Sequence, residues 1–177
     1  WPKLHRKGSI RNLLIIRNGL RRSIGTKRVQ LNSARPVLIY GAGIHLSGAE
    51  NEARDFAHYL KIPIVPTWGG LDILPSDDPL VVGSFGTHGT RAGNFAVQNA
   101  TSILAIGTRL DSKATGTPIE TFARAAHITM VDIDPRETEK FNGRVVGIHE
   151  DAKHYLQASH PRIEISEGWI EQVQQWK

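Results

Sequence analysis

Nine residues from Arg35 to Gly43, RPVLIYGAG, decide the fold of this chain. Residues 36–40 form a continuous apolar and aromatic run, which is typical of a strand that is buried on both faces. Two glycines, Gly41 and Gly43, follow at once and predict a tight turn. A strand of this kind needs a covering layer on each side of its sheet, and the sequence after Gly43 offers helices for both layers.

Strand-like and helix-like segments alternate along the rest of the chain. In residues 49–63, apolar residues recur at spacings of three and four, as on the buried face of a helix. Such an alternation requires parallel strands joined by crossover helices. We therefore predict an α/β domain with a doubly wound, Rossmann-like parallel sheet of about five to six strands and helices on both faces. The other predicted strands are 62–67, 102–107 and 127–134, a further helix is 91–100, and a short strand and a last helix share residues 144–159.

The composition is that of an ordinary globular protein. Of the 177 residues, 40% are hydrophobic and 22% are charged, which fits one domain with an appended arm. The absence of cysteine excludes disulfides and thiolate metal sites and fits a reducing compartment, so we expect a cytoplasmic protein. No apolar run approaches the roughly 20 residues of a membrane span, and we expect no membrane partner. The sequence contains no P-loop, no G-x-S-x-G motif and no metal-ligand spacing.

Charge is distributed unevenly along the chain. Residues 1–49 contain ten Lys and Arg residues and no acidic residue, whereas the remainder has twelve basic and seventeen acidic residues. The basic arm, residues 1–33, is compatible with an amphipathic helix on a partner domain, a targeting sequence, a nucleic-acid tether or a plain linker. We favour the linker. Nucleic acid is disfavoured as a partner, because Trp1 is the only aromatic residue of the arm and no pattern for base recognition is present.

Four segments fall at the predicted carboxyl ends of the strands, where doubly wound sheets bind ligands. They are residues 41–43, 67–69, 107–111 and 132–135. A glycine-rich turn before a helix can bind an anion through free N–H groups, and an aspartate at the end of a strand is a usual partner of ribose hydroxyls. Together the four segments predict a nucleotide-shaped groove.

Each of these signals also has a purely structural interpretation. GAG-x4-G departs from the strict G-x-G-x-x-G pattern, and its glycines are equally compatible with a tight turn. Arg109 is suited to a phosphate, but also to the carboxylate of Asp111 or Asp134. His88 is either a ligand contact or a hydrogen-bonded loop residue.

Residues 83–96, GSFGTHGTRAGNFA, contain four glycines in fourteen positions. Their aromatic and aliphatic residues do not fit a flexible tail, and a plain helix would not tolerate the glycines. The stretch therefore predicts a loop whose backbone is approached closely, and our interpretation is that the ligand of the groove makes this approach.

The order of these segments resembles the middle domain of thiamine-diphosphate-dependent enzymes, in the acetolactate synthase branch. The resemblance covers about residues 34–177 and is carried by RPVLIYGAG, by KIPIVPTWGGLDILPSDDPLVVGSFGTHGTRAGNFAVQNATSILAIGTRLD, by HITMVDIDPRE and by the final WIEQVQQWK. It implies a central domain without catalytic residues. Thiamine diphosphate and magnesium would bind only in the full-length parent enzyme, a transferase-type carboligase or a decarboxylase that acts on 2-keto acids. No G-D-G motif, which holds magnesium in that family, occurs in this sequence.

The resemblance further implies that the groove holds FAD or ADP. It divides the chain into the arm 1–33, a nucleotide-binding domain 34–160 and an exit segment 161–177 toward a missing domain. The partners would be the missing pyrimidine- and diphosphate-binding domains, and the full-length enzyme would be a homo-oligomer. The alternative is a stand-alone or truncated nucleotide-binding scaffold without activity. Departures from the family pattern are Gly69 and Thr108. The implied cofactor-binding residues are Gly41, Ala42, Gly43, Thr67, Gly86, Thr87, His88, Gly89, Gly107, Arg109, Asp111, Asp132 and Ile133.

Overall fold

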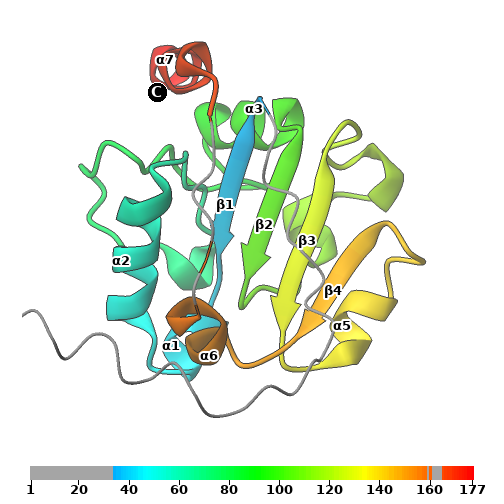
Figure 1. Ribbon diagram of the computed structural model, residues 1–177. Coiled ribbons are helices and arrows are strands. Elements are labelled where there is room, and N and C mark those ends of the chain that lie inside the picture. Colours follow the sequence, from blue (N-terminus) through cyan, green and yellow to red (C-terminus); the bar gives the residue numbers. More distant parts are fainter. Residues whose placement is uncertain (1–33, 159, 161–164) are drawn as a thin grey trace, which may run out of the picture.

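The computed structural model describes residues 34–158, 160 and 165–177 of the chain. Its centre is a parallel sheet of four strands in the order β1-β2-β3-β4 (Figure 1). The strands are β1 (Pro36–Tyr40), β2 (Ser102–Ile106), β3 (His127–Asp132) and β4 (Val145–His149). The prediction of a doubly wound α/β domain is confirmed. The expectations for the arm, residues 1–33, lie outside the described residues.

The sheet has fewer strands than the five to six that the sequence predicted. The expected strand 62–67 lies beside β1 but is reduced to one bridge, Leu38 to Ile64, and a second bridge joins Ile64 to Val81. Pro63 and Pro66 lie on either side of Ile64 and lack the N–H groups that a longer ladder would use. The segment nevertheless stays hydrogen-bonded to β1, since the Leu38 N–H donates to the Pro63 carbonyl and the N–H groups of Val65 and Thr67 donate to the carbonyls of Leu38 and Tyr40, each at 2.9 Å.

Helices cover both faces of the sheet, as Figure 1 shows. Alternate residues of β1 point to opposite faces: Leu38 and Tyr40 belong to one buried cluster, and Val37 and Ile39 belong to the other. The first face is covered by α1 (Gly43–Leu46), α2 (Glu50–Leu60) and α6 (Ala152–Gln157), and the second by α3 (Arg91–Asn99) and α7 (Glu167–Trp176). The shorter elements are η2 (Trp68–Gly70), α4 (Ser112–Thr115), η3 (Ile119–Thr121) and α5 (Pro135–Glu139).

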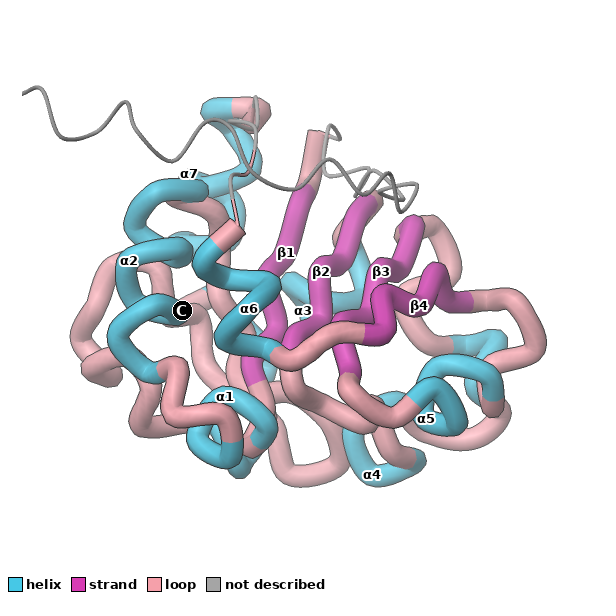
Figure 2. The backbone as a smooth tube through the Cα atoms, turned by 60° about the horizontal axis from the view of Figure 1, so that its bottom comes forward, coloured by secondary structure: helices cyan, strands magenta, loops and turns pink. Residues whose placement is uncertain are grey.

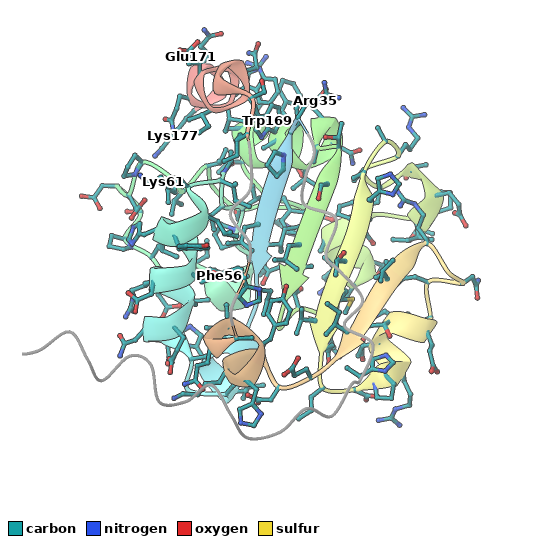
Figure 3. The ribbon with its side chains drawn as sticks, viewed as in Figure 1. Arg35, Phe56, Lys61, Trp169, Glu171 and Lys177 are labelled. Carbon is teal, nitrogen blue, oxygen red and sulfur yellow. The ribbon has the colours of Figure 1, made fainter. Side chains whose placement is uncertain are left out.

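The C-terminal helix α7 packs on the domain rather than away from it. Trp169 is buried and its Nε1–H donates to the Pro36 carbonyl at 3.0 Å, and Val173 is buried in the same cluster as Val37. Figure 3 shows Trp169 and Arg35 at the amino end of β1. The described part of the predicted exit segment is thus tied to the first strand, while its role toward another domain stays a prediction.

Candidate functional site

A pocket of about 550 Å³ opens at the carboxyl ends of the strands. The chain passes from β1 to one side of the sheet, through Ile64 and Val81, and returns on the other side of β1 as β2. The pocket therefore lies at the point where the winding reverses, which is where open α/β sheets bind ligands. Figure 2 brings this edge forward, with α1, α4 and α5 arranged around it.

The structure brings ten of the thirteen predicted binding residues to the wall of this pocket. Gly41, Gly86 and Gly89 do not line it. The ten that do are Ala42, Gly43, Thr67, Thr87, His88, Gly107, Arg109, Asp111, Asp132 and Ile133. All four predicted strand-end segments therefore converge, although contact of these residues with a ligand stays a prediction.

The glycines after β1 make room for the backbone that follows β2. A Cβ atom on Gly43 would lie 2.5 Å from the Cα atom of Gly107, and a Cβ atom on Gly41 would lie 2.5 Å from the Gly107 oxygen. The N–H groups of Gly41 and Gly43 donate to the carbonyls of Ile106 and Gly107 at 3.1 and 2.8 Å. These two N–H groups are thus already used, and an anion in the pocket would need other partners.

The glycine-rich stretch 83–96 is also explained by close contact between backbone segments. A Cβ atom on Gly86 would lie 2.6 Å from the Lys113 oxygen, and one on Gly89 would overlap the Cα atom of Phe85. Asn94 fixes Gly86 from the other side, since its Oδ1 accepts from the Gly86 N–H at 2.9 Å and its Nδ2 donates to the Gly86 carbonyl at 3.2 Å. What comes close to this backbone is other backbone of the same domain.

The positive charge of Arg109 has no partner in the described part of the structure. Its guanidinium has no hydrogen bond, ion pair or ring contact among the described residues. The two carboxylates that could have paired with it are occupied elsewhere: Asp111 accepts from the N–H groups at the start of α4, and Asp134 pairs with Arg136 at 2.7 Å. Leu110, which follows, is buried with a φ of 46°, so the backbone is fixed in a conformation that is uncommon outside glycine.

His88, from the loop before α3, and Trp68, from η2, meet at the wall of the pocket. Their ring centroids are 5.1 Å apart, and the rings are tilted by 45°. Trp68 is 61% exposed, and two further apolar side chains of the pocket, Leu46 and Ile133, are 88% and 74% exposed. A pocket wall with an indole, an imidazole and exposed aliphatic groups suits a planar ring.

Acidic side chains gather at the ends of β3 and β4. Asp132 ends β3, and Glu150 and Asp151 follow β4 directly. The Glu150 N–H donates to the Asp132 carbonyl at 3.2 Å, which brings the two segments side by side. Sequence reasoning missed Glu150, Asp151 and Lys113, although the position of Glu150 and Asp151 after the apolar run Val145–His149 was a usable signal.

Two further observations concern metal ions and membranes. Among the described residues, no group of three or more His, Cys, Asp or Glu side chains could hold a metal ion. In the same part of the chain, no helix is long and apolar enough to cross a membrane.

Comparison with known proteins identifies the relatives of this chain. Residues 30–159 match the family model described as "Thiamine pyrophosphate enzyme, central domain". The probable acetolactate synthase large subunit of Methanocaldococcus jannaschii is 39% identical over 150 residues, which are 82% of this chain and 25% of that protein. Acetolactate synthase 1, chloroplastic, of Zea mays is 44% identical over 132 residues, or 75% of this chain and 20% of that protein. Acetolactate synthase isozyme 2 large subunit of Escherichia coli is 34% identical over 132 residues, or 75% and 24%. The chain spans a quarter or less of the length of these relatives.

Proposed function

This chain belongs to the family of thiamine pyrophosphate enzyme central domains, and we propose that its pocket binds an adenine nucleotide, FAD before ADP. The resemblance inferred from the sequence is confirmed at the level of the family and of its acetolactate synthase-like relatives. The proposed role is that of a non-catalytic nucleotide-binding domain in a larger enzyme of that kind.

The observation that carries this proposal is the uncommitted guanidinium of Arg109 in the pocket. Arginine presents its N–H donors as a planar fork that matches two phosphate oxygens, and it stays charged at any pH of interest. Lys113 lines the same part of the pocket and adds a second cation without an ion pair in the described structure. The carboxylate of Asp111 lies in the same loop but accepts from the N–H groups at the start of α4, so a diphosphate group between the loops after β1 and β2 would meet the two cations.

The remaining walls of the pocket suit the other parts of a nucleotide. Trp68 and His88 offer ring surfaces for a planar base or flavin ring, and the carboxylate of Asp132 can accept hydrogen bonds from ribose hydroxyls. In this proposal FAD, when bound, serves the domain as a structural group that fixes the loops around the pocket.

The activity of the parent enzyme is also a proposal, because the chain covers only a part of its relatives. We infer a carboligase or decarboxylase of 2-keto acids whose other domains bind thiamine diphosphate and magnesium. By the same likeness we expect a homo-oligomer in the cytoplasm.

The test is a titration of the purified chain with FAD, followed by flavin fluorescence and by calorimetry, with ADP as a competitor. We expect saturable binding of both ligands and a rise in melting temperature, because a ligand that binds the folded state stabilises it by mass action. Arg109→Ala should weaken binding at least about tenfold, since a hydrogen bond to a charged group contributes about 1.5–3 kcal/mol.

Arg124→Ala is the matched control, because it removes the same charge from an exposed position outside the pocket. Its affinity for FAD should equal that of the unchanged protein. If neither FAD nor ADP binds at millimolar concentration, or if Arg124→Ala and Arg109→Ala weaken binding equally, the proposal is wrong.

A further inference from the structure

The two cations of the pocket and its carboxylates without cationic partners lie over different strands. Arg109 and Lys113 line it on the side of β2, together with Asp111, whose carboxylate accepts from the N–H groups at the start of α4. Asp132 and Glu150 line it at the ends of β3 and β4. A nucleotide in this pocket would therefore meet cations with one part and carboxylates with another.

The two carboxylates are free to accept hydrogen bonds from a ligand. Of the two carboxylate oxygens of Asp132, Oδ1 accepts a hydrogen bond from the Asp134 N–H at 2.9 Å, and Oδ2 accepts none from a described residue. The carboxylate of Glu150 has no hydrogen bond or ion pair in the described part of the chain. Asp132 pairs in register with His149, so Glu150 lies one residue beyond the pair and at the same edge.

The cations nearest in sequence to these carboxylates are committed to other partners. Arg136 pairs with Asp134 at 2.7 Å, and Lys153, which follows Glu150 by three residues, pairs with Glu52 at 3.4 Å and donates to the Gly48 carbonyl at 2.8 Å. No described cation forms an ion pair with Asp132 or Glu150. An anionic group placed here would be repelled, whereas hydroxyl groups would donate hydrogen bonds to both carboxylates.

The geometry points to a pocket that accepts only nucleotides whose ribose has free hydroxyls, with Asp132 and Glu150 as the residues that set this specificity. A 2′-phosphate would bring between one and two additional negative charges to two uncompensated carboxylates. The inference rests on the proposed nucleotide function, and it names the ligand class more narrowly: ADP-type nucleotides bind, and their 2′-phosphorylated counterparts are rejected.

The experiment compares ADP with adenosine 2′-phosphate 5′-diphosphate, which differs from ADP only by the 2′-phosphate. Binding to the full 177-residue chain is measured by calorimetry at low and at physiological salt. We expect ADP to bind at least about tenfold more tightly, which corresponds to about 1.4 kcal/mol. The ratio should fall as salt increases, because screening weakens the repulsion.

Two nearly isosteric variants identify the source of the discrimination. Glu150→Gln and Asp132→Asn each remove one negative charge, and the amide introduced by Asp132→Asn would keep an oxygen for the Asp134 N–H. Both should reduce the preference for ADP several-fold, mainly by improved binding of the 2′-phosphate. Glu171→Gln is the control, since Glu171 lies on α7 at the opposite end of the sheet (Figure 3), and it should leave the ratio unchanged.

The outcomes separate this inference from the proposed function. If ADP binds and the 2′-phosphate analogue binds equally well, the inference is wrong and the proposed function stands. If the ratio persists in both pocket variants, Asp132 and Glu150 do not set it, and the inference is again overturned. If ADP does not bind at all, the proposed function fails and this inference fails with it.

Discussion

Two arginines at opposite ends of the strands differ in their contacts, one within the fold and the other in the pocket. Arg144 precedes β4, and its guanidinium donates to the carbonyls of Ala126 and Ala123 at 2.9 and 2.7 Å. Arg109 follows β2 at its carboxyl end and has no partner in the described part of the chain. Arg144 thus stabilises the fold at the amino ends of the strands (the amino edge), whereas Arg109 at the carboxyl ends (the carboxyl edge) remains available to a ligand.

The difference extends to the neighbours of the two arginines. At the amino edge, Arg35 donates to the Asn99 carbonyl at 2.7 Å and Trp169 to the Pro36 carbonyl at 3.0 Å, so their polar groups serve the fold. At the carboxyl edge, Lys113 and Glu150 form no ion pair with described residues. Charged groups without a partner among the described residues also occur outside the pocket, as at Arg124, so it is the gathering of Arg109, Lys113 and Glu150 in one pocket that favours a binding site.

The largest expected effect belongs to the amino edge. Trp169→Ala should reduce the free energy of unfolding by about 3–5 kcal/mol, because it removes a buried indole and its hydrogen bond to β1. Urea denaturation measures this loss. Glu171→Ala, an exposed change on the same helix, should stay within about 0.5 kcal/mol. A loss below about 1 kcal/mol for Trp169→Ala would show that α7 is not part of the stable domain.

The next effect concerns the contact between the two turns under the pocket. Gly43→Ala should destabilise the domain by about 1–3 kcal/mol, because the new Cβ would overlap the Cα atom of Gly107. Gly168→Ala is the control, since Gly168 lies in α7 and a Cβ atom added to it would meet no atom within 4 Å. It should stabilise the helix by about 0.5–1 kcal/mol. Equal unfolding midpoints for the two variants would contradict the close contact.

A smaller effect is expected from His45, which joins α1 to the loop that carries Trp68. Its Nδ1 lies 2.9 Å from Glu50 Oε1 and its Nε2 lies 2.8 Å from Asp72 Oδ1. Ionised carboxylates only accept, so both contacts are hydrogen bonds only while both ring nitrogens of His45 carry protons. The hydrogen bond to Glu50, followed by that to Asp72, raises the pKa of His45 above its ordinary 6.5.

The sign of the pH dependence follows from that direction. A raised pKa means that the contribution of His45 to stability is complete below about pH 6.5 and is lost as the pH rises through the pKa of the folded state. The lowered pKa values of Glu50 and Asp72 set the acid limit of the same interaction. The urea midpoint should therefore fall slightly between pH 6 and pH 9, and His45→Gln should reduce this fall. His154→Gln, an exposed change, should leave it intact. An unchanged pH dependence in His45→Gln would refute the ion pairs.

The sequence predicted the main strands because their continuous apolar runs are the signal of strands buried on both faces. Residues 36–40 and 102–107 are recognisable in this way, and the structure confirms both as parallel neighbours. The segment 62–67 lies beside β1 as predicted but forms single bridges instead of a regular strand, because Pro63 and Pro66 lack N–H donors, which hydrophobicity does not reveal. The rule for strand ends predicted where the pocket lies, whereas Glu150 was missed because the rule was not applied to the end of β4.

The role of the glycines could not be read from the sequence for a different reason. Gly43 and Gly86 are needed because backbone segments from α1, α4 and the loop after β2 meet there. A glycine that faces a ligand and a glycine that faces another turn have the same one-letter code. Only the distances between the segments distinguish the two cases.

The most direct test of the central claim is a crossed measurement on the two arginines. For Arg109→Ala we predict a free energy of unfolding within about 0.5 kcal/mol of the unchanged chain and an affinity for FAD that is weaker by about 1.5–3 kcal/mol. For Arg144→Ala we predict the reverse: a loss of about 1.5–3 kcal/mol in stability, and an unchanged FAD affinity of the folded protein. A destabilised Arg109→Ala protein whose folded fraction binds FAD normally would contradict the assignment of the carboxyl edge as the binding site.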